Sequence, residues 1–222
     1  EEQLRSVQSR LSYLRNLGQR KQTVLKSIAE QGKLTPELEK AIREATTLQQ
    51  VEDLYLPFKP KRRTRATVAR EKGLQPLADL LIAQEITSGT LDERAQAFLS
   101  EQVPTVEEAY AGARDIMAEL VSEDADVRGA LRRLALKRGV LTVSLTEEGA
   151  DPQAVYQMYH EYSEPLRDIP AHRLLAINRG EKEGAPRVHL DVPVEETLSY
   201  PILRHVRNPE SIFAEQIETA IV

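Results

Sequence analysis

The sequence predicts a mainly α protein, a multihelical bundle with at most a small two-stranded β element. Apolar residues recur three and four positions apart through most of the chain, as they do on one face of an amphipathic helix. Only two stretches alternate apolar with polar residues, as strands do. Three helix-start signatures, each a Thr with a Glu or Gln three residues later, can cap backbone amides: Thr47 with Gln50, Thr90 with Glu93, and Thr105 with Glu108.

The first half of the chain is predicted to be a series of helices. A long first helix is expected to end at Gly32, since glycine tolerates the positive φ of a helix end. Thr35-Pro36 is expected to start a second helix, and further helices follow the capping signatures, one of them from Thr105 to about Val121. Another runs from about Ala125 to Arg138. The stripe that predicts the first helix consists of Leu4, Val7, Leu11 and Leu14.

The second half combines short helices with two strands. Val140–Leu145 and 188–192 are predicted as strands that could pair with each other. Between them, Asp151-Pro152 is expected to open a tyrosine-rich helix and Pro170 another, and Asn208-Pro209 is expected to cap a final helix. We expect a multihelical region over residues 1–139 and a smaller region with the strands over 140–222. The missing initiator Met and the uncapped last helix predict a piece of a longer protein.

Composition excludes several classes of function. The 222 residues include no Cys, which excludes disulfide scaffolds, thiolate zinc sites and cysteine nucleophiles and suits the reducing cytoplasm. The longest aliphatic run, residues 80–83, is far too short for a membrane helix. The four His residues lack metal-ligand spacing, and glycine-rich phosphate loops and nucleophile motifs are absent. We therefore expect no catalytic residue, no metal and no cofactor, and do not expect an enzyme.

A basic segment at residues 57–72 is the strongest candidate for a functional site. The fourteen residues from Lys59 to Lys72 carry a charge of +6, whereas the other 208 carry −11. Pro57 and Pro60 are expected to keep the chain extended, so that the cations could track successive phosphates. Alternatively, the segment docks on acidic residues such as Glu52 and braces the fold. The candidate cations are Lys59, Lys61, Arg62, Arg63, Arg65, Arg70 and Lys72.

Three weaker candidates have both a functional and a structural interpretation. Tyr156, Tyr159 and Tyr162 would form a stripe on one helix, either a base-stacking platform or, as we favour, a packed helix boundary. The cations of the helix ending at Arg138 could contact a nucleic acid backbone, but ion pairs and the helix dipole explain them better. The third set is expected to brace the core rather than bind an anion: His172, Arg173 and Arg179.

The basic segment also carries a family resemblance. The run EDLYLPFKPKRRTRA at residues 52–66, followed by AREKGL at 69–74, resembles the bacterial Tex transcription accessory proteins. The resemblance spans nearly the whole chain in order. Shorter matches to the same family are GKLT at 32–35, ARDI at 113–116, YSEP at 162–165 and PAHR at 170–173.

The resemblance implies a cytoplasmic, elongated, mostly helical protein linked to transcription, similar to the core of a eukaryotic elongation factor that also acts as a histone chaperone. Full family members continue into a ribonuclease-H-type domain, helix–hairpin–helix units and a C-terminal S1 domain. The S1 and helix–hairpin–helix parts are the family's accepted nucleic-acid binders, and this piece contains neither.

Two functions follow as hypotheses. In the first, the chain is the non-enzymatic N-terminal helical region of a nucleic-acid-binding transcription accessory protein. Its basic segment would then make weak, salt-dependent auxiliary contacts to RNA or DNA phosphates. In the second, the chain is a protein-interaction scaffold that organises the missing domains or docks on the transcription machinery. Neither hypothesis places the chain at a membrane.

Overall fold

A computed structural model describes residues 2–60, 63–146, 151 and 153–222 of the chain. Contacts group the chain into two compact units, one of Glu1–Gly129 with Ile202–Val222 and one of Ala130–Pro201. The predicted mainly α class is confirmed. The expected division of the chain after residue 139 stays a prediction.

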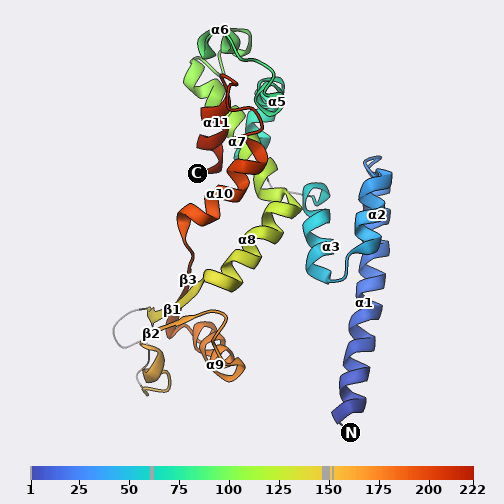
Figure 1. Cartoon of the computed structure of the whole chain (residues 1–222), viewed down its shortest axis with the longest axis vertical. Coiled ribbons are helices and arrows are strands. Elements are labelled where there is room, and N and C mark those ends of the chain that lie inside the picture. The colour runs from blue at the N-terminus through green and yellow to red at the C-terminus, as the bar shows by residue number, and fades with distance from the viewer. Residues whose placement is uncertain (1, 61–62, 147–150, 152) are drawn as a thin grey trace. The chain divides into compact units, whose positions relative to one another are not determined.

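The elements follow one another along the chain as labelled in Figure 1. The α-helices are α1 Glu2–Glu30, α2 Pro36–Glu44, α3 Leu48–Tyr55, α4 Arg65–Glu71, α5 Gln75–Ala83, α6 Leu91–Ala95, α7 Val106–Glu123, α8 Ala125–Arg138, α9 Ala171–Lys182, α10 Val194–His205 and α11 Ala214–Ile221. Short 3-10 helices are η1 Leu56–Phe58, η2 Gln96–Phe98 and η3 Gln157–Tyr159. The strands are β1 Val140–Leu145, β2 Glu161–Pro165 and β3 Pro186–Asp191.

Hydroxyl caps start the helices as the sequence predicts. The Thr47 and Thr90 hydroxyls each accept a hydrogen bond from the backbone amide three residues later, and Gln50 and Glu93 complete both capping boxes. At α7 the Thr105 hydroxyl accepts from the Glu108 amide at 3.2 Å, which is one half of the expected box. Local hydrogen bonding therefore fixes where these helices begin.

The first helix is continuous, but only its second half is buried. Leu17, Val24 and Ile28 pack with residues of α2 and α3 in a small apolar cluster. Gly32 follows the helix with a φ of +67°, as expected for a glycine that ends a helix. The stripe that predicted the helix, at residues 4, 7, 11 and 14, is exposed.

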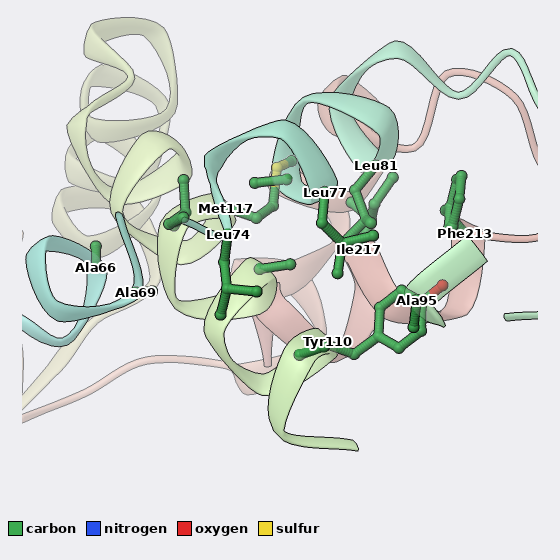
Figure 2. Packing of buried hydrophobic residues seen from close by; sticks show 14 of the residues in the cluster. Ala66, Ala69, Leu74, Leu77, Leu81, Ala95, Tyr110, Met117, Phe213 and Ile217 are labelled. Atoms are coloured by element: carbon green, nitrogen blue, oxygen red, sulfur yellow. The ribbon is translucent and has the colours of Figure 1, made fainter. Parts of the chain in front are cut away.

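The largest core surrounds α7. Leu77 and Leu81 of α5 pack against α7, and Ile217 of α11 joins them (Figure 2). The final helix begins at Ala214, so the expectation that Asn208-Pro209 caps it is wrong. The Asn208 side chain instead accepts from the Glu210 amide and donates to the Gln84 carbonyl, so it holds a turn.

The second unit contains one more strand than the sequence predicts. β1 pairs antiparallel with β3, a pairing that the sequence left open, and also with β2, which gives the order β2-β1-β3. The predicted tyrosine-rich helix is wrong: the chain makes a single 3-10 turn and then enters β2. The Asp151 carboxylate accepts from the Val155 and Tyr156 amides, which favours a turn over a continuous helix. Pro152 lies outside the described residues.

Tyrosines fill the core of the second unit. Tyr156 and Tyr159 are buried with Leu141, Val143 and Ile177, beneath the sheet and against α9. Gly180 permits this packing, because a Cβ there would lie 2.9 Å from both a Pro186 and a Tyr156 side-chain carbon. Within the described parts of the chain, every helix is too short or too polar to cross a bilayer.

Candidate nucleic-acid interface

The basic segment is less extended than the prolines suggested. Residues 56–58 form the 3-10 turn η1, and the backbone becomes extended at Lys59, whose ψ is 134°. Arg65 then begins α4, so the expectation of a continuous extended ribbon is wrong. Pro57 stands in the first turn of η1, where its missing N–H breaks no hydrogen bond. Lys61 and Arg62 lie outside the described residues.

One end of the segment is anchored to α7. The Arg70 guanidinium lies 2.6 Å from Oε2 of Glu119, and its Nε donates to Gln75. The Thr64 hydroxyl caps α4 and also donates to Oε1 of Glu119 at 3.1 Å. The Glu119 side chain is only 10% exposed, so Arg70 compensates a largely buried carboxylate. Arg70 therefore occupies a bracing position.

The other cations of the segment that the structure describes are exposed to solvent. The Arg65 side chain is 89% exposed and its Nε lies 3.5 Å from Asp115, which is a loose ion pair. Arg63 is 69% exposed and contacts Glu71 at 2.7 Å. Lys59 and Lys72 are also exposed. Exposed ion pairs contribute little to stability, so these cations could exchange their carboxylates for another anion at low cost.

These outward cations border a groove between α4 and α7. The groove has a volume of about 500 Å³, and Arg63, Arg65 and Lys72 line it. Aliphatic atoms of α4 and α7 form the rest of its wall, together with two carboxylates, Glu108 and Asp115. The lining thus combines three cations with two carboxylates, so an approaching phosphate would be attracted by the former and repelled by the latter.

Sequence reasoning missed the carboxylates on α7 that lie beside the segment, two of which pair with its cations. Glu108, Asp115 and Glu119 share one face of that helix with Gly112, since their spacing follows the helical period. A Cβ at Gly112 would lie 2.3 Å from Cδ1 of Leu74, so the glycine is what lets this region approach α7. A glycine within an acidic helical stripe was the signal in the sequence that could have located the docking face.

The acidic residues just upstream of the segment are held by other cations. Glu52 forms two hydrogen bonds with Arg20, and Asp53 accepts from Arg128 at 3.0 Å. The hydrogen bond from Arg20 lowers the pKa of Glu52 below its ordinary value, although burial opposes the shift, and the charge of Lys59 adds to it. The pairing with Arg20 therefore keeps Glu52 ionised beside the basic segment.

The tyrosines do not form a stacking platform. Tyr156 and Tyr159 are 6% and 7% exposed, and the Tyr159 ring meets Tyr162 edge to face. The Tyr156 hydroxyl donates to Glu183 at 2.6 Å, and that of Tyr162 donates to Glu164. The hydrogen bond to Glu183 raises the pKa of Tyr156 above its ordinary value, and burial adds to the shift. The favoured packing role is right, but the rings pack under a sheet rather than between helices.

The remaining sequence candidates are spread over the chain. Arg128 bonds to buried Asp53, and Arg138 bonds to Glu196. Arg173 pairs with Glu164 and Arg179 with Glu183, which matches the expected bracing role, whereas His172 is exposed. Among the residues that the structure describes, no three His or carboxylate side chains gather as a metal site would require.

Comparison with known proteins adds independent information. The family model described as Tex central region-like matches residues 88–220. Uncharacterized protein YdcI of Bacillus subtilis is 39% identical over 224 residues, which cover all of this chain and 31% of that protein. Transcriptional accessory protein Tex of Neisseria gonorrhoeae is 41% identical over 203 residues, 89% of this chain and 27% of that protein. S1 RNA-binding domain-containing protein 1 of Homo sapiens is 28% identical over 191 residues, 80% of this chain and 18% of that protein. The chain thus spans less than a third of these curated relatives.

Proposed function

This chain belongs to the Tex family, and we propose that it is a non-enzymatic helical region of a cytoplasmic transcription accessory protein that contacts nucleic acid. The names of its relatives, which include an S1 RNA-binding domain-containing protein, suggest a nucleic-acid-related role. The contact would be an auxiliary one, made to phosphates by the outward cations of the basic segment. It would be weak and salt-dependent, to RNA or DNA.

The observation that carries the proposal is the difference in exposure and ion pairing among the cations of the segment. Arg65 is 89% exposed and only loosely paired, whereas Arg70 is bonded to a largely buried carboxylate. The proposed phosphate contacts are the outward members, Lys59, Arg63, Arg65 and Lys72, together with Lys61 and Arg62, and Arg70 is the brace.

Salt dependence of binding tests this assignment. A labelled DNA duplex titrated with the chain should give a slope of log K against log salt of roughly −5 if the six proposed cations each neutralise a phosphate. Arg65→Gln and Arg63→Gln should each reduce the magnitude of the slope by roughly 0.9. Single-stranded RNA of equal length, titrated in parallel, should give a slope smaller by roughly a quarter.

Arg70→Gln is the matched control, because it makes the same chemical change in the same helix. It should leave the slope unchanged and instead lower the free energy of unfolding by about 1 kcal/mol, since it leaves the buried Glu119 carboxylate without Arg70. Asp115→Asn should tighten binding, because it removes a negative charge beside Arg65. An unchanged slope in Arg63→Gln and Arg65→Gln would refute the phosphate contacts.

A second candidate function is the protein-interaction scaffold. The aliphatic and carboxylate lining of the groove favours it, because these groups suit a protein surface better than a phosphate chain. Failure of the unmodified chain to bind either nucleic acid at low salt would support the scaffold over the phosphate contacts.

A further inference from the structure

The first half of α1 exposes an apolar stripe. Leu4 is 74% exposed, Val7 65%, Leu11 46% and Leu14 47%. Exposing four large apolar side chains along one face of a helix is unfavourable, because burial of each would lower the free energy of the system. The next apolar residue along the helix, Leu17, is 5% exposed and belongs to the cluster with α2 and α3. The stripe therefore ends where the helix enters the packed part of its own unit.

The stripe has the spacing of a coiled-coil seam. Steps of three, four and three residues place Leu4 and Leu11 at a positions and Val7 and Leu14 at d positions of two heptads. At 100° per residue, the seam lies about a quarter turn away from the face formed by Leu17, Val24 and Ile28. It is thus a separate face of α1 rather than a frayed end of the buried one.

Two of the four residues flanking the seam are cationic, and none is acidic. In this register Arg10 is at g and Arg15 at e, on opposite sides of the stripe, and the other flanking positions hold Gln3 and Gln8. The guanidinium of Arg10 lies 5.3 Å from the Tyr13 ring, while the Tyr13 hydroxyl accepts from the Leu48 amide at the start of α3. Tyr13 thus ties this part of α1 to the rest of its unit.

Charge discriminates between the partners that could cover the seam. In a parallel pair of helices, the g residue of one helix lies opposite the e residue five positions later on the other. A second copy would therefore place Arg10 against Arg15 twice, which is repulsive. A helix with Glu at its own e and g positions would form two attractive pairs there instead.

We propose that residues 4–15 of α1 are a docking face for an amphipathic helix with apolar a and d residues and acidic e and g residues. This inference is separate from the proposed phosphate contacts, because it uses none of the residues of the basic segment. It assigns the chain an interaction with a protein helix of defined chemistry.

Two synthetic peptides of three heptads test the proposal. Both have Leu at a and d and are otherwise identical, except that one has Glu and the other Lys at every e and g position. Like charges keep each peptide from pairing with itself. Fluorescence anisotropy with the whole chain should show binding of the Glu peptide roughly tenfold tighter than that of the Lys peptide.

Variants of the chain make the test specific. Arg10→Glu with Arg15→Glu should reverse the preference, whereas Arg5→Glu, which lies away from the seam, should preserve it. Leu4→Ser with Leu11→Ser should abolish binding of both peptides without changing the helical circular dichroism, since both positions are exposed.

Several outcomes would overturn the proposal. Equal binding of both peptides, or binding of neither, would exclude charge-selective helix docking. Self-association in sedimentation velocity that Leu4→Ser with Leu11→Ser removes would assign the seam to a second copy. Seam-dependent binding to phosphatidylserine vesicles, without a preference between the peptides, would assign it to a membrane surface.

Discussion

The two units of the chain reach a packed core by different chemistry. The unit around α7 is held mainly by aliphatic side chains, with the rings of Tyr110 and Phe213 among them, buried between helices whose starts are fixed by local caps. The unit of the small sheet is held by tyrosines whose hydroxyls bond to carboxylates, which in turn bond to arginines. The first depends mainly on apolar burial, and the second on a chain of charged and polar contacts.

This difference predicts that the two units respond differently to the same kind of change. Loss of apolar volume should weigh most in the α7 unit, while the sheet unit should be sensitive to close contacts around its tyrosines. Hydrogen exchange measured at the level of individual peptides reports the stability of each unit separately.

The largest effect is expected at Phe213. Its side chain is fully buried in the core around α7 and its ring contacts Tyr110. Phe213→Ala should reduce the stability of that unit by about 3–5 kcal/mol, because it removes a large side chain from a dense core. Protection should fall in α5 and α7, with the sheet unit little changed. Leu203→Ala, at a position 80% exposed, is the control and should change little. Loss confined to α11 would show that the core is not cooperative.

An intermediate effect is expected at Gly180 in the sheet unit. Gly180→Ala should destabilise that unit by about 1–3 kcal/mol, because its Cβ would lie 2.9 Å from Pro186 and Tyr156 carbons. Gly18→Ala makes the same change in α1, where the new Cβ would have no described neighbour within 4 Å apart from the adjacent residues and local backbone of its own helix. It should stabilise the other unit by about 0.5–1 kcal/mol. If Gly180→Ala and Gly18→Ala changed the free energy of unfolding of their units in the same direction, the packing argument would be contradicted.

The smallest effect is expected from protonation of His205. Burial lowers the pKa of this imidazole below its ordinary value of 6.5, while Asp124 opposes the shift and Arg204 and Arg207 add to it. Its Nε2 is buried without a hydrogen-bond partner among the described residues and lies 3.5 Å from Asp124 Oδ2. The unfolded chain therefore binds this proton at higher pH than the folded chain does.

The α7 unit should thus keep its full His205 contribution above pH 6.5 and lose it as pH falls through the folded pKa. His205→Gln should remove this loss. The sheet unit should respond at lower pH, because hydrogen bonds from Tyr156 and Arg179 lower the pKa of Glu183 below its ordinary 4.5. The contribution of Glu183 to the stability of the sheet unit is fully present above pH 4.5 and is lost as the pH falls through the pKa of Glu183 in the folded state. If the stability of the α7 unit depended on pH in the same way in His205→Gln and in the unmodified chain, the loss at low pH would belong to another group.

The difference between the α7 unit and the sheet unit also explains which elements the sequence could predict. Helix starts in the α7 unit depend on residues three positions apart, so the Thr caps located them correctly. β2 escaped prediction because its residues, EYSEP, lack the alternation of aliphatic and polar side chains that marks β1 and β3. The tyrosine spacing of three also fits a helix, and only the turn held by Asp151 excludes one.

The candidate site was predictable in composition but not in orientation. The charge of the basic segment stands out in the sequence, yet nothing local distinguishes Arg70, which faces Glu119, from Arg65, which faces solvent. That distinction depends on α7, about fifty residues further along the chain. The phosphate contacts themselves stay a prediction.

The missing side chain at residue 112 has an electrostatic consequence. It sets how closely α4 approaches α7, and hence how far the guanidinium of Arg65 lies from the carboxylate of Asp115. Because the attraction between charges falls with their separation, a neutral methyl group added at this position would alter the local potential without altering the net charge. In this protein, an uncharged residue, Gly112, thus affects the electrostatic potential around Arg65 and Asp115.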